Sequence, residues 1–384
     1  MRTIAVVTTG RADYGIYLPV LRRICKVPDL KLCLIAGGSH LSSEYGSTVD
    51  TIKADGFEIS ECVECLPRSD SPVAVSSAIG RGINGFAEAY DRQKPDMILV
   101  LGDRFEMFAA TAAAVPLLIP VAHIHGGEIT EGAIDDSFRH AITKLSHLHF
   151  VSTEESKGRV LQMGEEAWRV KVSGAPSLDN LGEMELATLH EVELQIGFSL
   201  PSPFLLATYH PATLGNEDAT RQVTEFMGAM EEAGLPVIFT APNADQGRGI
   251  VVSSIEKYVI AHSGSRYVRN LGTRLYFSLM KHAAAMAGNS SSGIIEAASL
   301  GLPVVNVGNR QRGRLHGKNV IDVPCEKGAI LGAIKKAISP TFRESLKGLE
   351  NPYGNGHAAE LIVETLASVP LDRRLIVKRF VDLN

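Results

Sequence analysis

Residues 97–140 contain a cluster of titratable side chains with the composition of an acid–base site. The stretch MILVLGDRFEMFAATAAAVPLLIPVAHIHGGEITEGAIDDSFRH carries Asp103, His123, His125, Glu128, Asp135, Asp136 and His140. Strongly interacting titratable groups gather at functional sites. Each side chain also has a structural alternative, since an Asp can cap a helix or occupy a turn. Taken together, the residues of the cluster favour a catalytic acid–base role over purely structural roles.

Two predicted strands would position this cluster. Residues 97–101 form a continuous apolar run that leads to Asp103, as is typical of a buried parallel strand entering a helix. After an Ala-rich helix, a second strand over residues 119–124 leads to His125. Ligands bind just outside the carboxyl ends of strands in open α/β sheets. We therefore expect a carboxylate and an imidazole to meet at this edge, near the helix that begins with Asp135.

A second candidate site lies in residues 288–293, GNSSSG, between a short strand and a helix. Free backbone N–H groups, hydroxyls and the positive end of a helix favour an anion there. Ser290 and Ser291 would contact phosphate, whereas Glu296 suits a ribose diol. Arg310, in the loop GNRQRGR after the next strand, would add a guanidinium, although a solvated basic loop is the alternative. This pattern predicts a nucleoside diphosphate site.

Two further residues follow strands and could contribute. His210 closes the first strand of the second half, where a histidine can also be a simple strand cap. Arg11, in the turn GRADYG after the first strand, could fork onto a phosphate or could be a surface residue. The same turn lacks GxGxxG spacing, so a dinucleotide cofactor is not predicted.

The alternation of strands and helices predicts an α/β fold with two Rossmann-like, doubly wound domains facing across a cleft. Strands and helices alternate over residues 3–173, and the alternation restarts at residue 204 after a Pro-containing, looser segment. The predicted boundaries are 1–175 for the first domain, 176–202 for a linker, 203–368 for the second domain with the candidate nucleoside diphosphate site, and 369–384 for a charged tail.

Composition excludes several classes of protein. The 384 residues carry a net charge of −5, so there is no overall basic field to hold nucleic acid or an anionic membrane. The longest apolar run, residues 112–122, contains two prolines and is shorter than the ~20 residues that a membrane span needs. The N-terminus has no signal-peptide core, and the five cysteines offer only a lone CxxC, Cys62 to Cys65. We expect a cytoplasmic protein with reduced thiols.

The combined motifs resemble those of one family over nearly the whole chain, from about residue 5 to residue 365. These motifs are GRADYG, GGSHLSSEYG, LGDRFE, HIHGGE with IDDSFRHAITKLSH, the dipeptide at His210, PNAD at Asn243, GNSSSGIIE and GNRQRGR. They are similar to those of the hydrolysing UDP-N-acetylglucosamine 2-epimerases of sialic acid and legionaminic acid biosynthesis. No single motif would be specific.

The resemblance implies two Rossmann-like domains of the GT-B type and no cofactor. It implies conversion of UDP-N-acetylglucosamine and water to N-acetylmannosamine and UDP, by anti elimination of UDP through 2-acetamidoglucal and then hydration. By the same resemblance, Asp103 and Asp135 are acid–base carboxylates and His210 contacts the leaving diphosphate. The implied substrate ligands are Arg11, Asn243, Ser290, Ser291, Glu296 and Arg310. A homo-oligomer, dimer or tetramer, is also implied.

One position departs from part of the family. The human-type enzyme and the non-hydrolysing epimerases carry a glutamate at the end of the second strand, whereas this chain has His125, as some bacterial hydrolysing members do. The group that handles the carbon 2 proton is therefore open among His125, Glu128 and Asp135.

Other readings remain at this point. The HxH of His123 and His125 could belong to a metal-dependent hydrolase, although we expect no metal. A GT-B glycosyltransferase would share the fold and the UDP site but would not require the acidic cluster. A silent UDP-sugar-binding regulator would bind without releasing UDP. The sugar could also be UDP-2,4-diacetamido-2,4,6-trideoxyglucose, of the legionaminic acid route.

Overall fold

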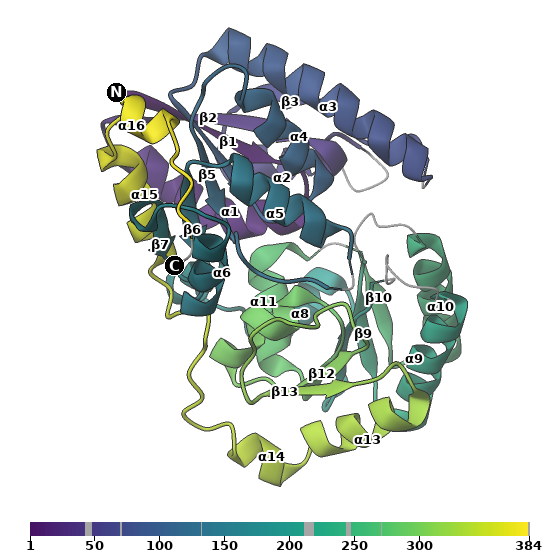
Figure 1. Cartoon of the computed structure of the whole chain (residues 1–384). Helices are drawn as coiled ribbons and strands as arrows, with labels where there is room; N and C mark the ends of the chain where they lie inside the picture. The colour runs from purple at the N-terminus through teal and green to yellow at the C-terminus, as the bar shows by residue number, and fades with distance from the viewer. Residues whose placement is uncertain are drawn as a thin grey trace. The chain divides into compact units, whose positions relative to one another are not determined.

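The computed structural model describes residues 1–42, 48–69, 71–131, 133–210, 219–242, 247–269 and 271–382. The chain forms two compact units. The first combines Met1–Glu128, Asp135–Gly182 and Tyr353–Asn384, and the second combines Ile129–Ile134 and Glu183–Pro352. Each unit is built on one parallel sheet with helices packed around it (Figure 1).

The sheet of the first unit has seven strands in the order β3-β2-β1-β4-β5-β6-β7. They are β1 (Arg2–Thr8), β2 (Leu30–Gly37), β3 (Ile59–Val63), β4 (Met97–Leu101), β5 (Val121–Ile124), β6 (Leu148–Val151) and β7 (Val170–Val172). All pair in parallel. The order reverses between β1 and β4, and this switch point is where an open α/β sheet leaves a crevice for ligands. The residues after β1 and β4 are therefore placed for binding.

The helices of the first unit connect these strands and close the unit. They are α1 (Arg11–Lys26), the 3₁₀ turn η1 (Gly38–Leu41), α2 (Val49–Ala54), α3 (Pro72–Gln93), α4 (Phe105–Ala114), α5 (Asp135–Leu145), α6 (Glu154–Gln162), the 3₁₀ turn η3 (Ala167–Arg169), α7 (Ser177–Glu183), α15 (Ala358–Ser368) and α16 (Arg373–Ile376). Strand β4 is entirely buried, as its apolar run predicts.

The sheet of the second unit has six strands in the order β10-β9-β8-β11-β12-β13, again all parallel. They are β8 (Leu205–Thr208), β9 (Val237–Thr240), β10 (Arg266–Val268), β11 (Ala285–Gly288), β12 (Val304–Val307) and β13 (Val320–Val323). The helices are α8 (Leu189–Ile196), α9 (Ala219–Ala233), α10 (Arg248–Ala261), α11 (Gly272–His282), α12 (Ser291–Ile295), the 3₁₀ turn η4 (Ala297–Leu300), α13 (Lys327–Ala337) and α14 (Pro340–Glu344). The switch point here lies between β8 and β11.

The observed division differs from the boundaries expected from the sequence. Residues 176–202 do not form a separate linker, because α7 belongs to the first unit and α8 to the second. Helix α15 belongs to the first unit although it follows the second sheet. The physical reason is Asp179 in α7, whose carboxylate accepts the N–H groups of Ala358 (3.0 Å) and Ala359 (2.7 Å) at the start of α15. A carboxylate is stabilising at that end of a helix.

Two local features were not anticipated. Strand β3 is a short edge strand of mixed polarity, which lacks the apolar pattern that identifies the buried strands. Within the charged C-terminal tail, the described residues include the short helix α16. Within the described ranges, no helix has the length and apolar character to cross a membrane.

Candidate active site

Arg139 is the residue around which the acid–base cluster of the first unit assembles. It is 1% exposed, and its guanidinium forms an ion pair with Asp103, just after β4. It also donates to the carbonyl oxygen of His125 (3.0 Å) and lies 3.6 Å from the Glu128 carboxylate. Arg139 therefore joins the ends of β4 and β5 to helix α5.

His125 has a backbone conformation that few residues other than glycine adopt. Its φ is +65°, in the left-handed region, where a residue other than glycine is strained. Such strain persists at sites that the surrounding structure over-determines. Here the carbonyl of His125 is held by Arg139, and its amide donates to the Phe150 carbonyl (3.0 Å) on β6.

The His125 imidazole is oriented by Glu128. Nδ1 lies 2.5 Å from Glu128 Oε1, which also accepts a hydrogen bond from Ser152 (2.7 Å). Because a carboxylate accepts, we infer that Nδ1 carries a proton and donates it to Glu128. Nε2 is buried and has no hydrogen-bond partner among the described residues. The arrangement is that of a general base whose tautomer is set by a carboxylate.

Helix α5 presents one face to this cluster. Asp135, Arg139 and Thr143 are spaced four residues apart, so they lie on the same side of the helix. Asp135 is partly buried in the first turn, and Thr143 lies 3.2 Å from His123 Nδ1 at the other end. A shift of α5 would therefore displace Asp135 and Arg139 together.

His123 is a structural histidine. Its Nε2 donates to the Gly102 carbonyl (2.8 Å), and burial lowers the pKa of His123 to about 3, so the ring is neutral. Both ring nitrogens are thus occupied by protein contacts. Among the described residues no group of three or more His, Cys, Asp or Glu side chains could hold a metal ion, and the geometry does not support the metal-hydrolase reading.

Arg11 begins α1 at the switch point of the first sheet and is exposed. The turn before it is shaped by buried Asp13, which accepts hydrogen bonds from Thr8 Oγ1 (2.7 Å), Thr9 N (2.8 Å) and Gly10 N (3.1 Å). Burial alone would raise the pKa of Asp13, but His40 and these hydrogen bonds lower it. Asp13 therefore stays ionised and fixes the loop that carries Arg11.

Asn289 connects several segments of the second unit, as Arg139 does in the first. Its side chain pairs with the backbone of His210, accepting from N (2.7 Å) and donating to O (2.8 Å). Its carbonyl accepts from Arg310 Nη1 (3.0 Å) and Gln311 Nε2 (2.8 Å). One residue after β11 thus connects the end of β8 with the loop after β12.

The serine loop follows Gly288, where only glycine fits. Gly288 has φ +136°, and a Cβ there would lie 1.9 Å from the Thr208 carbonyl oxygen. Ser290 is the N-cap of α12, so Ser291 opens the helix, but α12 is only five residues long. The helix dipole expected from the sequence is correspondingly small, and the groups that could bind an anion are the backbone N–H and hydroxyl groups of the loop.

Tyr276 and Glu296 border the serine loop. Glu296 follows α12 and is 5% exposed. Burial raises the pKa of Tyr276, and the nearby Glu296 charge adds to this, while hydrogen bonds with Ser292, Thr208 and Ser290 oppose it. The Tyr276 phenol thus lies among the hydroxyls of this loop.

The structure brings the predicted residues together in two groups, one in each unit. In the first unit, Arg139 links Asp103, His125 and Glu128, and Asp135 lies on the same helix as Arg139. In the second unit, Asn289 contacts His210 and Arg310, and Ser290 follows it in the chain. Asn243 lies outside the described residues. The sequence reading missed Arg139, Asn289, Gln311 and Tyr276. Arg139 had a signal in its spacing of four from Asp135, and Asn289 and Gln311 lie within the motifs GNSSSG and GNRQRGR.

Two Rossmann-like units, with a titratable cluster at one set of strand ends and a hydroxyl-rich anion loop at the other, define a nucleotide-sugar enzyme of GT-B type. The family model for UDP-N-acetylglucosamine 2-epimerase matches residues 22–367. The chain belongs to the UDP-N-acetylglucosamine 2-epimerase family.

Curated relatives agree with this assignment. The chain is 38% identical to the UDP-N,N'-diacetylbacillosamine 2-epimerase (hydrolyzing) of Legionella pneumophila, over 98% of this chain and 99% of the relative. It is 32% identical to a UDP-N-acetylglucosamine 2-epimerase of Neisseria meningitidis, over the full length of both. The crystal structure of UDP-GlcNAc 2-epimerase from Neisseria meningitidis bound to UDP-GlcNAc has a TM-score of 0.80 at 22% identity, covering 95% of this chain and 99% of that one. This last likeness shows the fold.

Proposed function

We propose that the protein is a hydrolysing 2-epimerase of a UDP-2-acetamido sugar. It would release UDP by anti elimination, form a 2-acetamidoglucal, and add water to give the free sugar epimerised at carbon 2. The observation that carries the proposal is the His125–Glu128 pair, with Nδ1 2.5 Å from the carboxylate and Nε2 buried without a partner among the described residues. Elimination needs a base for the carbon 2 proton, and Nε2 is suited to that task.

The other groups have roles that follow from their charge and place. Asp103 and Asp135 would exchange protons during the addition of water, and Arg139 would orient the Asp103 and Glu128 carboxylates. In the second unit, Ser290, Ser291, Arg310 and His210 would hold the diphosphate as negative charge develops on it. Arg11 would add a phosphate contact, Glu296 would accept from the ribose hydroxyls, and Asn243 would complete the UDP ligands.

Two sugars fit the proposal. UDP-N-acetylglucosamine would give N-acetylmannosamine, a sialic acid precursor. UDP-N,N'-diacetylbacillosamine, which is UDP-2,4-diacetamido-2,4,6-trideoxyglucose, would give the corresponding diacetamido sugar of a legionaminic acid route. The second is favoured by the names of the Legionella relative and of a GDP/UDP-N,N'-diacetylbacillosamine 2-epimerase (hydrolyzing) of Campylobacter jejuni that is 36% identical.

The test is a proton NMR time course in deuterated water with each UDP-sugar offered separately. The expected result is release of UDP together with a free 2-epimerised sugar that carries deuterium at carbon 2. A free UDP-sugar epimer without UDP release would reject the hydrolysing reaction. Binding without turnover, or turnover only with an added acceptor, would favour the regulator or the glycosyltransferase.

The proposal places the enzyme in the cytoplasm as a homo-oligomer. The five cysteines are free thiols, which is what a reducing compartment predicts. The oligomeric state stays a prediction from the family resemblance, and light scattering of the purified chain measures it.

A further inference from the structure

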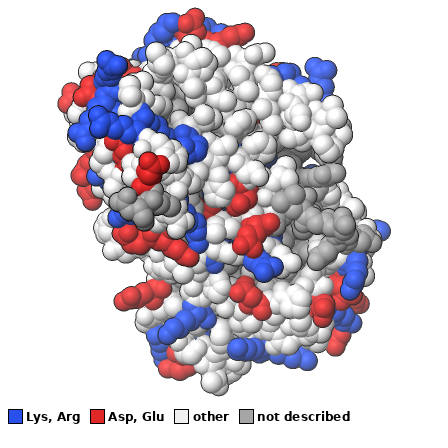
Figure 2. Space-filling model, in the orientation of Figure 1, with Lys and Arg blue, Asp and Glu red and all other residues white. Residues whose placement is uncertain are grey.

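The last described residues of the chain pack within the first unit through a network of buried charges. We call residues 372–382 the C-terminal clamp. They lie beyond residue 367, where the family match ends. Figure 2 shows Lys and Arg side chains gathered on the part of the surface where Figure 1 places α15 and α16. Two basic side chains near this part of the chain, those of Arg169 and Lys378, are instead directed into the protein.

Arg169 holds the backbone of the clamp. It is 0% exposed, and its guanidinium donates to the carbonyl oxygens of Arg374 (2.7 Å), Leu375 (2.8 Å) and Val377 (3.2 Å). It donates as well to the His147 carbonyl (3.1 Å) before β6. One buried cation thus ties three carbonyls of the clamp to the sheet, which fixes the path of the chain up to Lys378.

Lys378 then reaches the carboxyl end of α5. Its ammonium donates to the carbonyls of Lys144 (2.7 Å) and Ser146 (2.6 Å) and lies 2.8 Å from Glu165 Oε1. The last carbonyls of a helix have no partner within the helix, and a cation there is favourable. Lys378 therefore caps α5 from a segment more than 230 residues away in sequence.

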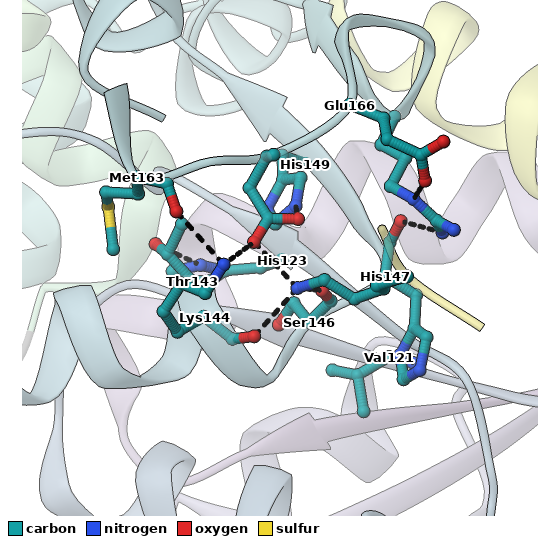
Figure 3. Close-up of polar contacts among 12 residues, drawn as sticks. Val121, His123, Thr143, Lys144, Ser146, His147, His149, Met163 and Glu166 are labelled. Atoms are coloured by element: carbon teal, nitrogen blue, oxygen red, sulfur yellow. Dashed lines mark hydrogen bonds and ion pairs between the residues drawn. The ribbon is translucent and has the colours of Figure 1, made fainter. Parts of the chain in front are cut away.

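Glu165 also contacts the carboxyl end of α5, through Lys144. It accepts from Lys144 Nζ (2.7 Å) and lies 3.1 Å from His149 Nε2, and its side chain is fully buried. Figure 3 shows Lys144, Ser146 and His149 converging in this network. Burial would raise the pKa of Glu165, but hydrogen bonds from His149, Lys144 and Lys378 lower it to about 2, so the carboxylate is ionised.

Phe380 completes the clamp. Lys144 Nζ lies 5.0 Å from the centre of its ring, and the amide of Val381 donates to the Gly164 carbonyl (3.0 Å). A Cβ at Gly164 would lie 2.6 Å from the Phe380 ring, and φ at Gly164 is +81°. The glycine permits the close approach of the clamp.

The helix capped in this way carries candidate catalytic groups at its other end. Helix α5 has 11 residues, so Asp135 lies about 16 Å from the capped end. Asp135 and Arg139 share one face of α5, and a displacement along the helix axis would move both relative to Asp103 and His125. Precise placement matters, because small misplacements of reacting groups reduce rates strongly.

We propose that Lys378 is a positioning residue: the C-terminal clamp fixes α5 in the axial position at which Arg139 contacts Asp103 and His125, with Asp135 on the same face of the helix. The inference rests on the proposed function for its effect on turnover, but the anchoring of α5 is a property of the first unit alone. Loss of the Lys378 ammonium would leave the UDP ligands of the second unit intact.

The experiment compares Lys378→Met, Lys378→Arg and the control Arg379→Met in the full-length chain. Arg379 is exposed, and its backbone N–H rather than its side chain contacts Glu166, so the control removes the same charge beside the same site. Hydrogen exchange of the α5 amides, kcat and KM on the accepted UDP-sugar, and the Kd of UDP are measured for each variant.

We expect Lys378→Met to raise exchange in α5 and to lower kcat at least tenfold, with the Kd of UDP changed less than twofold. Lys378→Arg should recover most of kcat, because a guanidinium can donate to the same carbonyls. Unchanged α5 exchange or unchanged kcat in Lys378→Met, or an equal loss in Arg379→Met, would overturn the proposal. If the wild-type protein turns over neither UDP-sugar, the proposed function fails, and α5 exchange alone decides for or against the clamp.

Discussion

Arg139 forms an ion pair with Asp103 while it donates to the carbonyl of His125, so one buried guanidinium links helix α5 to the ends of both strands that carry the acid–base groups. Through this link, the charge of Arg139 interacts with two carboxylates, those of Asp103 and Glu128. We therefore expect that substituting Asp103 lowers kcat, whereas substituting Arg139 lowers the stability of the first unit.

Asp103→Asn should lower kcat about 100-fold or more, since general acid–base groups contribute rate factors of that order. The amide keeps the size of the side chain and can still accept from Arg139. The Kd of UDP, whose proposed ligands lie mainly in the second unit, should stay within twofold in a calorimetric titration. Near-full turnover would remove Asp103 from the acid–base assignment.

Arg139→Met should destabilise the first unit by about 3–5 kcal/mol, because it leaves the buried Glu128 carboxylate and the Asp103 carboxylate without their cation. Urea unfolding measures the loss. Adding Glu128→Gln should recover part of it, because the uncharged amide needs no compensation. Additive losses in this double-mutant cycle would show that Arg139 and Glu128 are not coupled.

Two substitutions of His125 test separately the role of its imidazole and the strain of its backbone. His125→Asn tolerates a positive φ, so the protein should keep its thermal stability within a few degrees but lose incorporation of solvent deuterium at carbon 2. His125→Val adds strain of about 1–2 kcal/mol, because a β-branched residue is disfavoured in the left-handed region. If both variants melt alike, the φ of +65° is not a constraint.

Gln311→Leu should weaken UDP binding about tenfold. The Asn289 carbonyl would lose one of its two side-chain donors, and the loop that presents the serines would lose a buried contact. Arg312→Gln serves as the matched control, because Arg312 is exposed in the same loop and pairs with Glu131. A similar change in Kd for both variants would indicate a general effect of the loop rather than of Gln311.

Stability should fall on acidification below about pH 6.5, in part through His147. Burial, with the charges of Lys378 and Arg169, lowers the pKa of His147 to about 4, so the unfolded chain binds a proton that the folded chain does not between pH 6.5 and 4. Stability from this group is present above pH 6.5 and is lost as the pH falls. His147→Asn keeps an acceptor for the Val121 N–H and should reduce the slope of unfolding free energy by up to about 1.4 kcal/mol per pH unit. An unchanged slope would contradict the assignment.

Most of the fold could be predicted from the sequence, because buried parallel strands are continuous apolar runs with turn residues after them. The predicted strand over residues 97–101 coincides with β4, and the predicted strand over residues 119–124 contains β5. The placement of α15 could not be predicted, since it depends on Asp179 meeting a helix start nearly 180 residues later.

The sequence by itself determined which chemical groups follow the strands: Asp103, His125 and Glu128 in one half, and the serine loop with Arg310 in the other. It left open which of them act together. Tertiary structure decided that Arg139 binds Asp103, that Glu128 orients His125, that Asn289 holds His210, and that Lys378 caps α5. Periodicity reports the burial of a local segment, whereas these contacts join residues from different elements, and only the folded chain brings such residues within hydrogen-bond distance.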